Sequence, residues 1–130
     1  MLTGLILQLF ATFFVIGLFT FGGGYAMLSL IQGQVVVAHG WMAESTFTDI
    51  VAISQMTPGP IGINSATYIG YVAPMATDPS LSSPVWGIIG SVIATLAVTV
   101  PSFFLVLYCS HFIRRHQESG VIKAIFAGLR

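Results

Sequence analysis

The sequence contains very little charge. Four basic and four acidic residues are present among 130, or 6%, whereas a soluble domain of this size carries about a quarter. Apolar residues make up 55% and the mean hydropathy is +0.93, so the few charged groups cannot wet a whole surface. We therefore predict an all-α integral membrane protein with the bilayer as its solvent. The shortage of Lys and Arg also excludes a basic face for nucleic acid.

Cysteine and metal-ligand patterns are also scarce. Cys109 is the only cysteine, so an internal disulfide is excluded, and its apolar surroundings predict a small packed side chain. No two histidines have the i, i+3 or i, i+4 spacing of helical metal ligands, so we predict no metal and no cofactor. The histidines are His39, His111 and His116. Ser65, Ser102 and His111 form no recognisable nucleophile and base motif, so an enzyme is not predicted.

The N-terminal third holds the first interruption of an apolar stretch. Residues 5–21 lack the basic region and cleavage site of a secretory signal, so we expect a retained helix. Its reach of about 25 Å is short of a hydrocarbon core of about 30 Å. The glycine motif at 22–24 therefore falls at membrane depth, before apolar character resumes over 25–31. Residues 32–44 are expected to form an interfacial loop with Trp41 at the headgroup level.

A second interruption contains two prolines. Thr46 and Asp49 have the spacing of a capping box and predict a helix that begins near Phe47. That helix can continue only to about Met56, because the sequence Thr-Pro-Gly-Pro at 57–60 removes two backbone donors. The residues before each proline are also pushed out of the helical region. Two Gly or Pro breaks are thus predicted at membrane depth.

A half-helix is expected after the second break. It begins at Pro60, a favoured first-turn position, and runs to about Tyr71, ending before Pro74 and a polar loop at 77–83. The last long apolar stretch, 85–112, would reach about 42 Å as a helix, enough to span the membrane with tilt.

The C-terminal end of the long stretch carries the basic residues. Pro101 is expected to kink the helix. Arg114 and Arg115 follow it at once, and by the positive-inside rule they place this end in the cytoplasm. Residues 121–130 look like the start of a further helix.

The half-helix after the second break has two different faces. Asn64, Ser65 and Tyr68 follow Ile61 at i+3, i+4 and i+7 and form a polar stripe. The opposite face is a series of small residues that lets another helix approach closely: Gly62, Ala66 and Gly70. Broken helices with polar faces are how many secondary transporters build substrate sites. An ordinary kink, and an interhelical hydrogen bond from Asn64, remain the alternatives.

Asp49 has two interpretations. It shares a helical face with Thr48, Ala52 and Gln55, and a carboxylate inside the membrane would be a candidate for proton coupling. The alternative is the capping box near the interface.

Five motifs in order resemble the chromate ion transporter family. They are Phe-Gly-Gly-Gly-Tyr at 21–25, Gly-Trp at 40–41, Gln-Met-Thr-Pro-Gly-Pro-Ile-Gly at 55–62, Tyr-Ile-Gly-Tyr at 68–71 and Val-Pro-Ser-Phe at 100–103. The resemblance implies a multi-pass bacterial inner-membrane protein that exports chromate, with sulfate as the chemical analogue, driven by the proton gradient. Short members of the family are a single half and work as pairs of opposite orientation.

The chain departs from this family in two respects. Residues 1–130 form a single transmembrane domain that resembles one half, either truncated or unusually short. Gln32 and Gln34 also occupy a stretch in which the family pattern leads us to expect an acidic residue.

The main hypothesis is a transporter subunit that binds a small oxyanion at its two breaks. Its partners are membrane lipid and a second half, identical or homologous. Lys123 and Arg130 are candidates for the counter-charge that balances the anion. The rival hypotheses are a structural membrane subunit that transports nothing and an anion channel. The candidate binding residues are Gly22, Gly23, Gly24, Tyr25, Thr57, Gly59, Asn64, Ser65 and Tyr68.

Overall fold

The structure is a computed structural model and describes residues 2–19, 24–116 and 119–129. Every regular element in these ranges is a helix, which confirms the predicted all-α fold class. In chain order the elements are α1 (Leu2–Phe19), α2 (Gly24–Gln32), the π-helix η1 (Gly33–Ala38), α3 (Glu44–Met56), α4 (Ile61–Thr77), the 3-10 helix η2 (Pro79–Leu81), α5 (Pro84–Arg115) and α6 (Gly120–Gly128).

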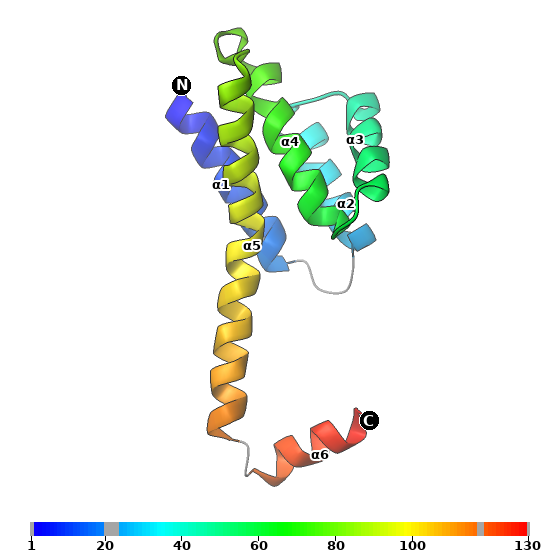
Figure 1. The fold of residues 1–130 in the computed structure, drawn as a ribbon, viewed down its shortest axis with the longest axis vertical. Helices are drawn as coiled ribbons and strands as arrows, with labels where there is room; N and C mark the ends of the chain where they lie inside the picture. Colours follow the sequence, from blue (N-terminus) through cyan, green and yellow to red (C-terminus); the bar gives the residue numbers. More distant parts are fainter. Residues whose placement is uncertain (1, 20–23, 117–118, 130) are drawn as a thin grey trace.

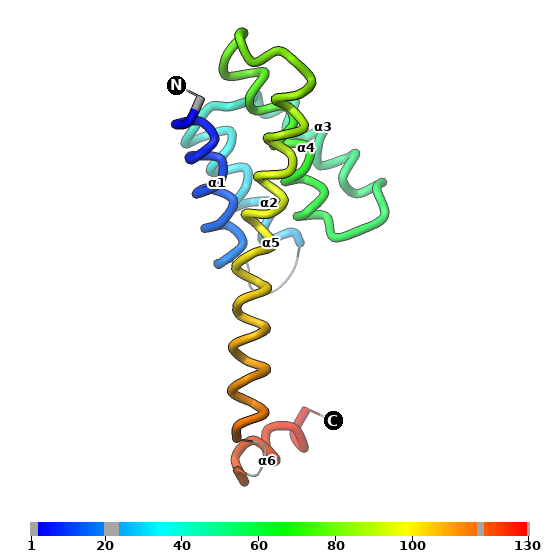
Figure 2. Tube along the Cα trace, turned by 60° about the vertical axis from the view of Figure 1, so that its left-hand side comes forward, coloured from blue at the N-terminus to red at the C-terminus, as the bar shows by residue number. Residues whose placement is uncertain are grey.

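The helices are arranged around the first half of α5. Helices α1 and α5 start at the same end of the molecule, and both α1 and α4 pack along α5 (Figure 1). The chain reverses direction at each break, so α2 leads back toward that end, α3 leaves it again and α4 returns to it. Figure 2 shows that the second half of α5 extends beyond this bundle to α6, which lies apart from the other helices.

Helix α5 is the candidate membrane span of the described chain. Its 32 residues reach about 48 Å, and it is the one helix of the described residues that is both long and apolar enough to cross a bilayer. The helix is continuous through Pro101. The apolar segments Thr3–Phe19 and Gly24–Ala38 are shorter.

Small residues allow the closest helix contacts. A Cβ added to Gly70 of α4 would collide with the carbonyl of Gly90 on α5. A Cβ on Gly17 of α1 would likewise collide with the carbonyl of Val98 on α5. The predicted small-residue face is therefore a packing face, and all its members are buried: Gly62, Ala66 and Gly70.

Hydroxyl groups link α4 to α5 at the same contact. The Thr67 hydroxyl donates to the carbonyl of Ile63 at 2.9 Å, so the Thr95 hydroxyl is the donor in the 2.8 Å bond between the two threonines. The Ser91 hydroxyl donates to the backbone oxygen of Thr67, also at 2.8 Å. These bonds fix the register of the two helices.

The prediction of a loop over 32–44 is wrong for most of these residues. Residues Gly33–Ala38 form a π-helix that continues α2, because Val35 is fully buried in the core and a single glycine does not end the helix. The loop is confined to the residues after this helix, where Gly40 has a φ of 60°. Trp41 is buried in the core cluster.

The predicted capping box is also wrong. Helix α3 begins before Thr46, with Ala43 at the N-cap position and no side-chain cap. Asp49 therefore lies in the second turn, exposed, instead of at the helix start.

Pro74 does not end the half-helix, as the sequence led us to expect. Helix α4 continues through Pro74 to Thr77. The proline has no N–H for the carbonyl of Gly70, and this carbonyl instead lies against Gly90, which has no side chain to obstruct it. Packing against α5 thus stabilises a proline inside the helix.

The prediction for Cys109 is wrong within this chain. Cys109 is a free, exposed thiol on the second half of α5, and residues 102–110 are all exposed. The apolar run there faces outward because no other helix of the described chain covers it.

Candidate functional site

The break between α3 and α4 is held in a specific backbone geometry. Thr57 is extended at the end of α3, and Gly59 has a φ of 143°, which side-chain-bearing residues rarely adopt. Pro60 is the N-cap of α4, and no described side chain caps this helix. The first N–H groups of α4 are therefore left without helical acceptors.

Asn64 joins the two sides of this break. Its side-chain Nδ2 lies 3.3 Å from the carbonyl oxygen of Ser54 and 3.1 Å from that of Thr57, both at the C-terminal end of α3. The polar stripe of α4 thus faces α3, and the structure gives Asn64 the interhelical hydrogen bonds that the sequence left as one of two roles.

Tyr68 and Ser65 occupy different surroundings. The Tyr68 hydroxyl lies 3.4 Å from the Thr57 hydroxyl, one turn beyond Asn64. Ser65 is fully buried, as is Ser54 of α3, and neither hydroxyl has a hydrogen-bond partner among the described residues. The structure therefore brings Thr57, Asn64 and Tyr68 together and leaves Ser65 in the interior.

The N-termini of α2 and α4 meet at one pocket. A Cβ on Gly24, the first residue of α2, would lie 3.7 Å from the Cβ of Ile61, the first residue of α4. A pocket of about 420 Å³ lies between them, and Met27 reaches across it to pack against Gly62. Its lining residues are Gly24, Met27, Gly59, Pro60, Ile61, Gly62 and Ile63. The first residues of α2 and α4 thus line a single pocket.

Aromatic residues on α5 indicate the depth of this pocket. Trp86 and Tyr108 are 22 residues apart, a rise of about 33 Å, which matches the two interfaces of a hydrocarbon core of about 30 Å. Val98, which contacts Gly17 near the end of α1, lies about 18 Å beyond Trp86 on this scale.

The start of α4 lies at the same level. Gly70 is level with Gly90, and Ile61 precedes Gly70 by nine residues, about 14 Å, in a helix antiparallel to α5. Ile61 is therefore level with Thr99 of α5. The first residues of α2 and α4, which lie side by side, are therefore level with the middle of the span between Trp86 and Tyr108.

Helix N-termini at this depth favour an anion. Each N-terminus carries the positive end of a helix dipole, and residues at both N-termini line the same pocket. The side chains that line the pocket are apolar, so backbone amides are its main donors.

Other candidate residues lie elsewhere or outside the described residues. Gly22, Gly23 and Arg130 lie outside them. Tyr25 is 72% exposed and does not line the pocket. Lys123 is exposed on α6, at the far end of α5 from the bundle, so this chain does not bring its charge to the pocket (Figure 1).

The Asp49 side chain has no hydrogen bond to any described residue, and Asp49 does not line the pocket. In the described part of the chain, no group of His, Cys, Asp or Glu side chains could hold a metal ion.

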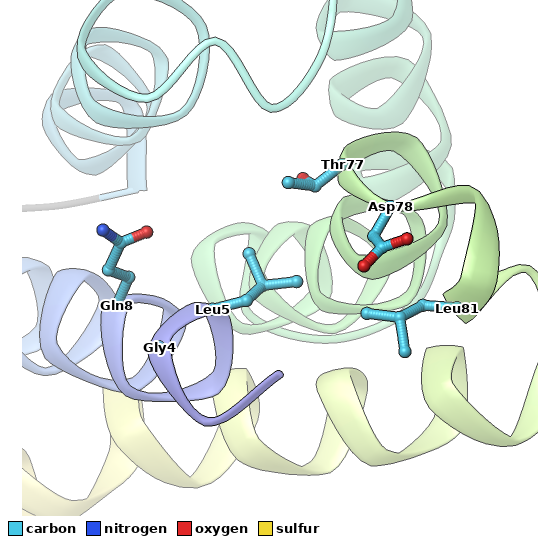
Figure 3. Close-up of a pocket in the computed structure, with 6 residues that line it drawn as sticks. All are labelled: Gly4, Leu5, Gln8, Thr77, Asp78 and Leu81. Atoms are coloured by element: carbon cyan, nitrogen blue, oxygen red, sulfur yellow. The ribbon is translucent and has the colours of Figure 1, made fainter. Parts of the chain in front are cut away.

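A second pocket has the opposite electrostatic character. It measures about 440 Å³ and lies between the start of α1 and the end of α4, where Gln8 and Asp78 face one another across Leu5 (Figure 3). Asp78 accepts hydrogen bonds from the hydroxyl and the backbone N–H of Ser80, at 2.7 and 2.9 Å. These bonds lower the pKa of the Asp78 carboxyl, which stays ionised and repels anions.

Sequence reasoning did not name five of the seven lining residues as binding candidates: Met27, Pro60, Ile61, Gly62 and Ile63. Met27 follows Gly24 by three residues and so shares a helix face with it, and this spacing could have predicted that Met27 lines the pocket. Ile63 gave no signal, because its position depends on how the two helix ends meet.

Comparisons with known proteins agree with this architecture. A family model described as chromate transporter matches residues 7–130. The chain is 32% identical to the uncharacterized transporter YwrA of Bacillus subtilis over 119 residues, which is 92% of this chain and 60% of that protein. It is 39% identical to the uncharacterized transporter MJ0718 of Methanocaldococcus jannaschii over 92 residues, 71% of this chain and 20% of that protein.

A named chromate transporter is also similar. The chromate transport protein of Cupriavidus metallidurans is 27% identical over 113 residues, 87% of this chain and 25% of that protein. The chain thus spans between about one fifth and three fifths of the length of these relatives. No solved structure matches the chain. Since the family model covers all but the first six residues, and with them both broken helices and the long apolar span, this membrane protein belongs to the chromate transporter family.

Proposed function

We propose that the chain is one half of a secondary transporter, not an enzyme, that moves a small tetrahedral oxyanion across the bacterial inner membrane. Chromate is the first candidate substrate, because relatives are named chromate transport proteins. Sulfate presents similar oxygens and charge, so amide donors alone would discriminate poorly between the two anions.

One observation carries the proposal: the N-termini of α2 and α4 meet at one pocket, level with the middle of the long apolar helix α5. Backbone that is not helical is tolerated at this depth only where it is buried in protein or lines a polar cavity. Half-helix N-termini that point at an anionic group are a recurring way of building transporter sites.

Two helix N-termini do not offset the cost of burying the anion, so a second half must contribute to the site. Taking an ion from water into a low-dielectric site costs several kcal/mol, whereas a helix N-terminus returns about 0.3 to 1 kcal/mol and up to roughly 2 in partly buried geometry. Two termini therefore fall short. Because Lys123 of this chain lies far from its own pocket, we assign the counter-charge to a side chain of the paired half, identical or homologous.

The proposed orientation follows from the basic residues. Arg114 and Arg115 end α5 and lie on the cytoplasmic side by the positive-inside rule. Both hairpins, α1–α2 and α3–α4, then enter and leave from the opposite side, and α5 alone crosses the membrane in this part of the chain.

Anion flux in liposomes tests the proposal. The purified protein should take up chromate with saturable kinetics. Ile63→Glu, which places a negative charge in the pocket, should abolish uptake, and the neutral Ile63→Gln of the same size should retain it. No flux with wild type would support the structural subunit, and flux that does not saturate would support the channel.

Crosslinking in native membranes tests the pairing. We expect a crosslinked species that contains two halves in every transport-active preparation. A monomer that transports alone would refute the paired site.

A further inference from the structure

We propose that Asn64 is a positioning residue that holds the break between α3 and α4 in shape and does not contact the anion. The inference rests on the proposed function, because the shape in question is that of the anion pocket. It replaces one of the two roles that the sequence allowed for this side chain.

The argument begins with a missing donor. In a continuous helix the carbonyl of Ser54 would accept a hydrogen bond from the N–H of residue 58, but Pro58 has none. Asn64 Nδ2 lies 3.3 Å from that carbonyl oxygen and takes the place of the absent N–H. A carbonyl left unpaired at this depth would be costly.

The second bond uses the remaining donor. Asn64 Nδ2 also lies 3.1 Å from the carbonyl oxygen of Thr57, where α3 has ended. A side-chain amide carries two N–H groups, and both are now committed to backbone oxygens. The one group left, Oδ1, is an acceptor and repels an oxyanion.

The loop is fitted closely around this side chain. A Cβ on Gly59 would lie 3.3 Å from Asn64 Oδ1, and the backbone N–H of Asn64 donates to the carbonyl of Pro60 at 3.0 Å. Asn64 therefore contacts the end of α3, the turn and the start of α4.

Tyr68 adds a second side-chain contact between α4 and the end of α3. The Thr57 hydroxyl donates to the carbonyl of Ile53 at 2.9 Å, so the Tyr68 hydroxyl must be the donor in its 3.4 Å contact with Thr57. Both side chains lie on one face of α4 and hold the end of α3 against it. The N–H groups of the first residues of α4 are thereby fixed at the pocket wall.

The test compares Asn64→Ala, the double variant Pro58→Ala with Asn64→Ala, and Gln55→Ala. Gln55 is exposed next to Ser54 on α3 and its side chain forms no hydrogen bond with described residues, so it is a matched control for loss of a side-chain amide. Thermal unfolding in detergent and chromate affinity in liposomes are measured for each. We expect Asn64→Ala to lower both, with a loss of roughly tenfold in affinity, about the effect of one buried unpaired group.

Pro58→Ala restores an N–H four residues after Ser54 and should recover part of the lost thermal stability. If Asn64 were an anion ligand, Asn64→Ala would lower the chromate affinity but leave thermal unfolding unchanged, and Pro58→Ala would recover no stability. This result would overturn the proposal. The unfolding data need no anion. Absence of chromate uptake by wild type would therefore refute the proposed function, while the recovery by Pro58→Ala would still decide the role of Asn64.

Discussion

The contact between α4 and α5 offers the sharpest test of the structure. We expect Gly70→Ala to destabilise the protein, although alanine is the better helix former. The added Cβ would collide with the carbonyl oxygen of Gly90, and it would lie 2.8 Å from the carbonyl carbon of that residue and 2.9 Å from the Cβ of Ala94. None of these atoms is the end of a flexible side chain, so the two helices must move apart.

The magnitude follows from two opposing effects. Overpacking of a close contact costs about 1 to 3 kcal/mol, and the hydroxyl bonds of Thr67 next to the contact are stretched as well. Replacing Gly by Ala inside a helix returns about 1 kcal/mol. The difference is about 0 to 2 kcal/mol, and because the stretched hydroxyl bonds add to the cost we expect a net loss in the upper half of this range, about 1 to 2 kcal/mol.

The assay is reversible unfolding in mixed micelles, followed by circular dichroism. Gly4→Ala is the control, because a Cβ on Gly4 meets nothing within 4 Å, and this change should be neutral or stabilising. Gly90→Ala should lower the free energy of unfolding about as much as Gly70→Ala does. The double variant should lose less stability than the sum of the two single losses, because the first substitution has already moved the helices apart. Equal stability of Gly70→Ala and Gly4→Ala would refute the contact.

Three further predictions concern other parts of the chain. Thr67→Val should destabilise the protein by roughly 0.6 to 1.7 kcal/mol through loss of its bond to α5, and Ser91→Ala should not add fully to that loss in the same unfolding assay. In intact cells, a membrane-impermeant thiol reagent should label Ser80→Cys, whereas Ser119→Cys should react only after permeabilisation; labelling of both from outside would reverse the orientation. The pKa of Asp78 is lowered by Ser80, so its stabilising contribution is present above about pH 4 and is lost as the pH falls through the lower folded value. Melting temperatures between pH 7 and 3 should therefore fall more for wild type than for Asp78→Asn, and parallel curves would exclude this contribution.

Local chemistry predicted the positions of the breaks. Two prolines within three residues remove donors whatever surrounds them, so the end of α3 at Met56 and the start of α4 at Ile61 were within reach of the sequence. The small-residue face of α4 was also predictable, because a stripe of Gly and Ala has few uses in a membrane helix other than close packing.

Tertiary packing decided what the sequence could not. The helix continues through Pro74 because the carbonyl of Gly70, which has no N–H partner at Pro74, lies against Gly90. Gly90 has no side chain to obstruct it and is 16 residues further along the chain. The π-helix after Gln32 persists because Val35 is buried in a core made by other helices. The convergence of Gly24 and Ile61 on one pocket likewise depends on how two hairpins dock, which no local pattern encodes.

The depth of the hairpins connects the fold to the need for a second half. The bundle of α1 to α4 covers α5 only as far as about Pro101, and the pocket lies at that level. Beyond it, α5 continues for 14 residues to Arg115, and all of these residues except Ile113 are exposed. Lipid can cover the apolar side chains of this segment, but it cannot pair the free amides at the pocket mouth or neutralise a dianion. We infer that a protein surface with donors or positive charge covers the pocket in the working unit, because the basic residues of the described chain, Arg114, Arg115 and Lys123, lie at the far end of α5 or on α6.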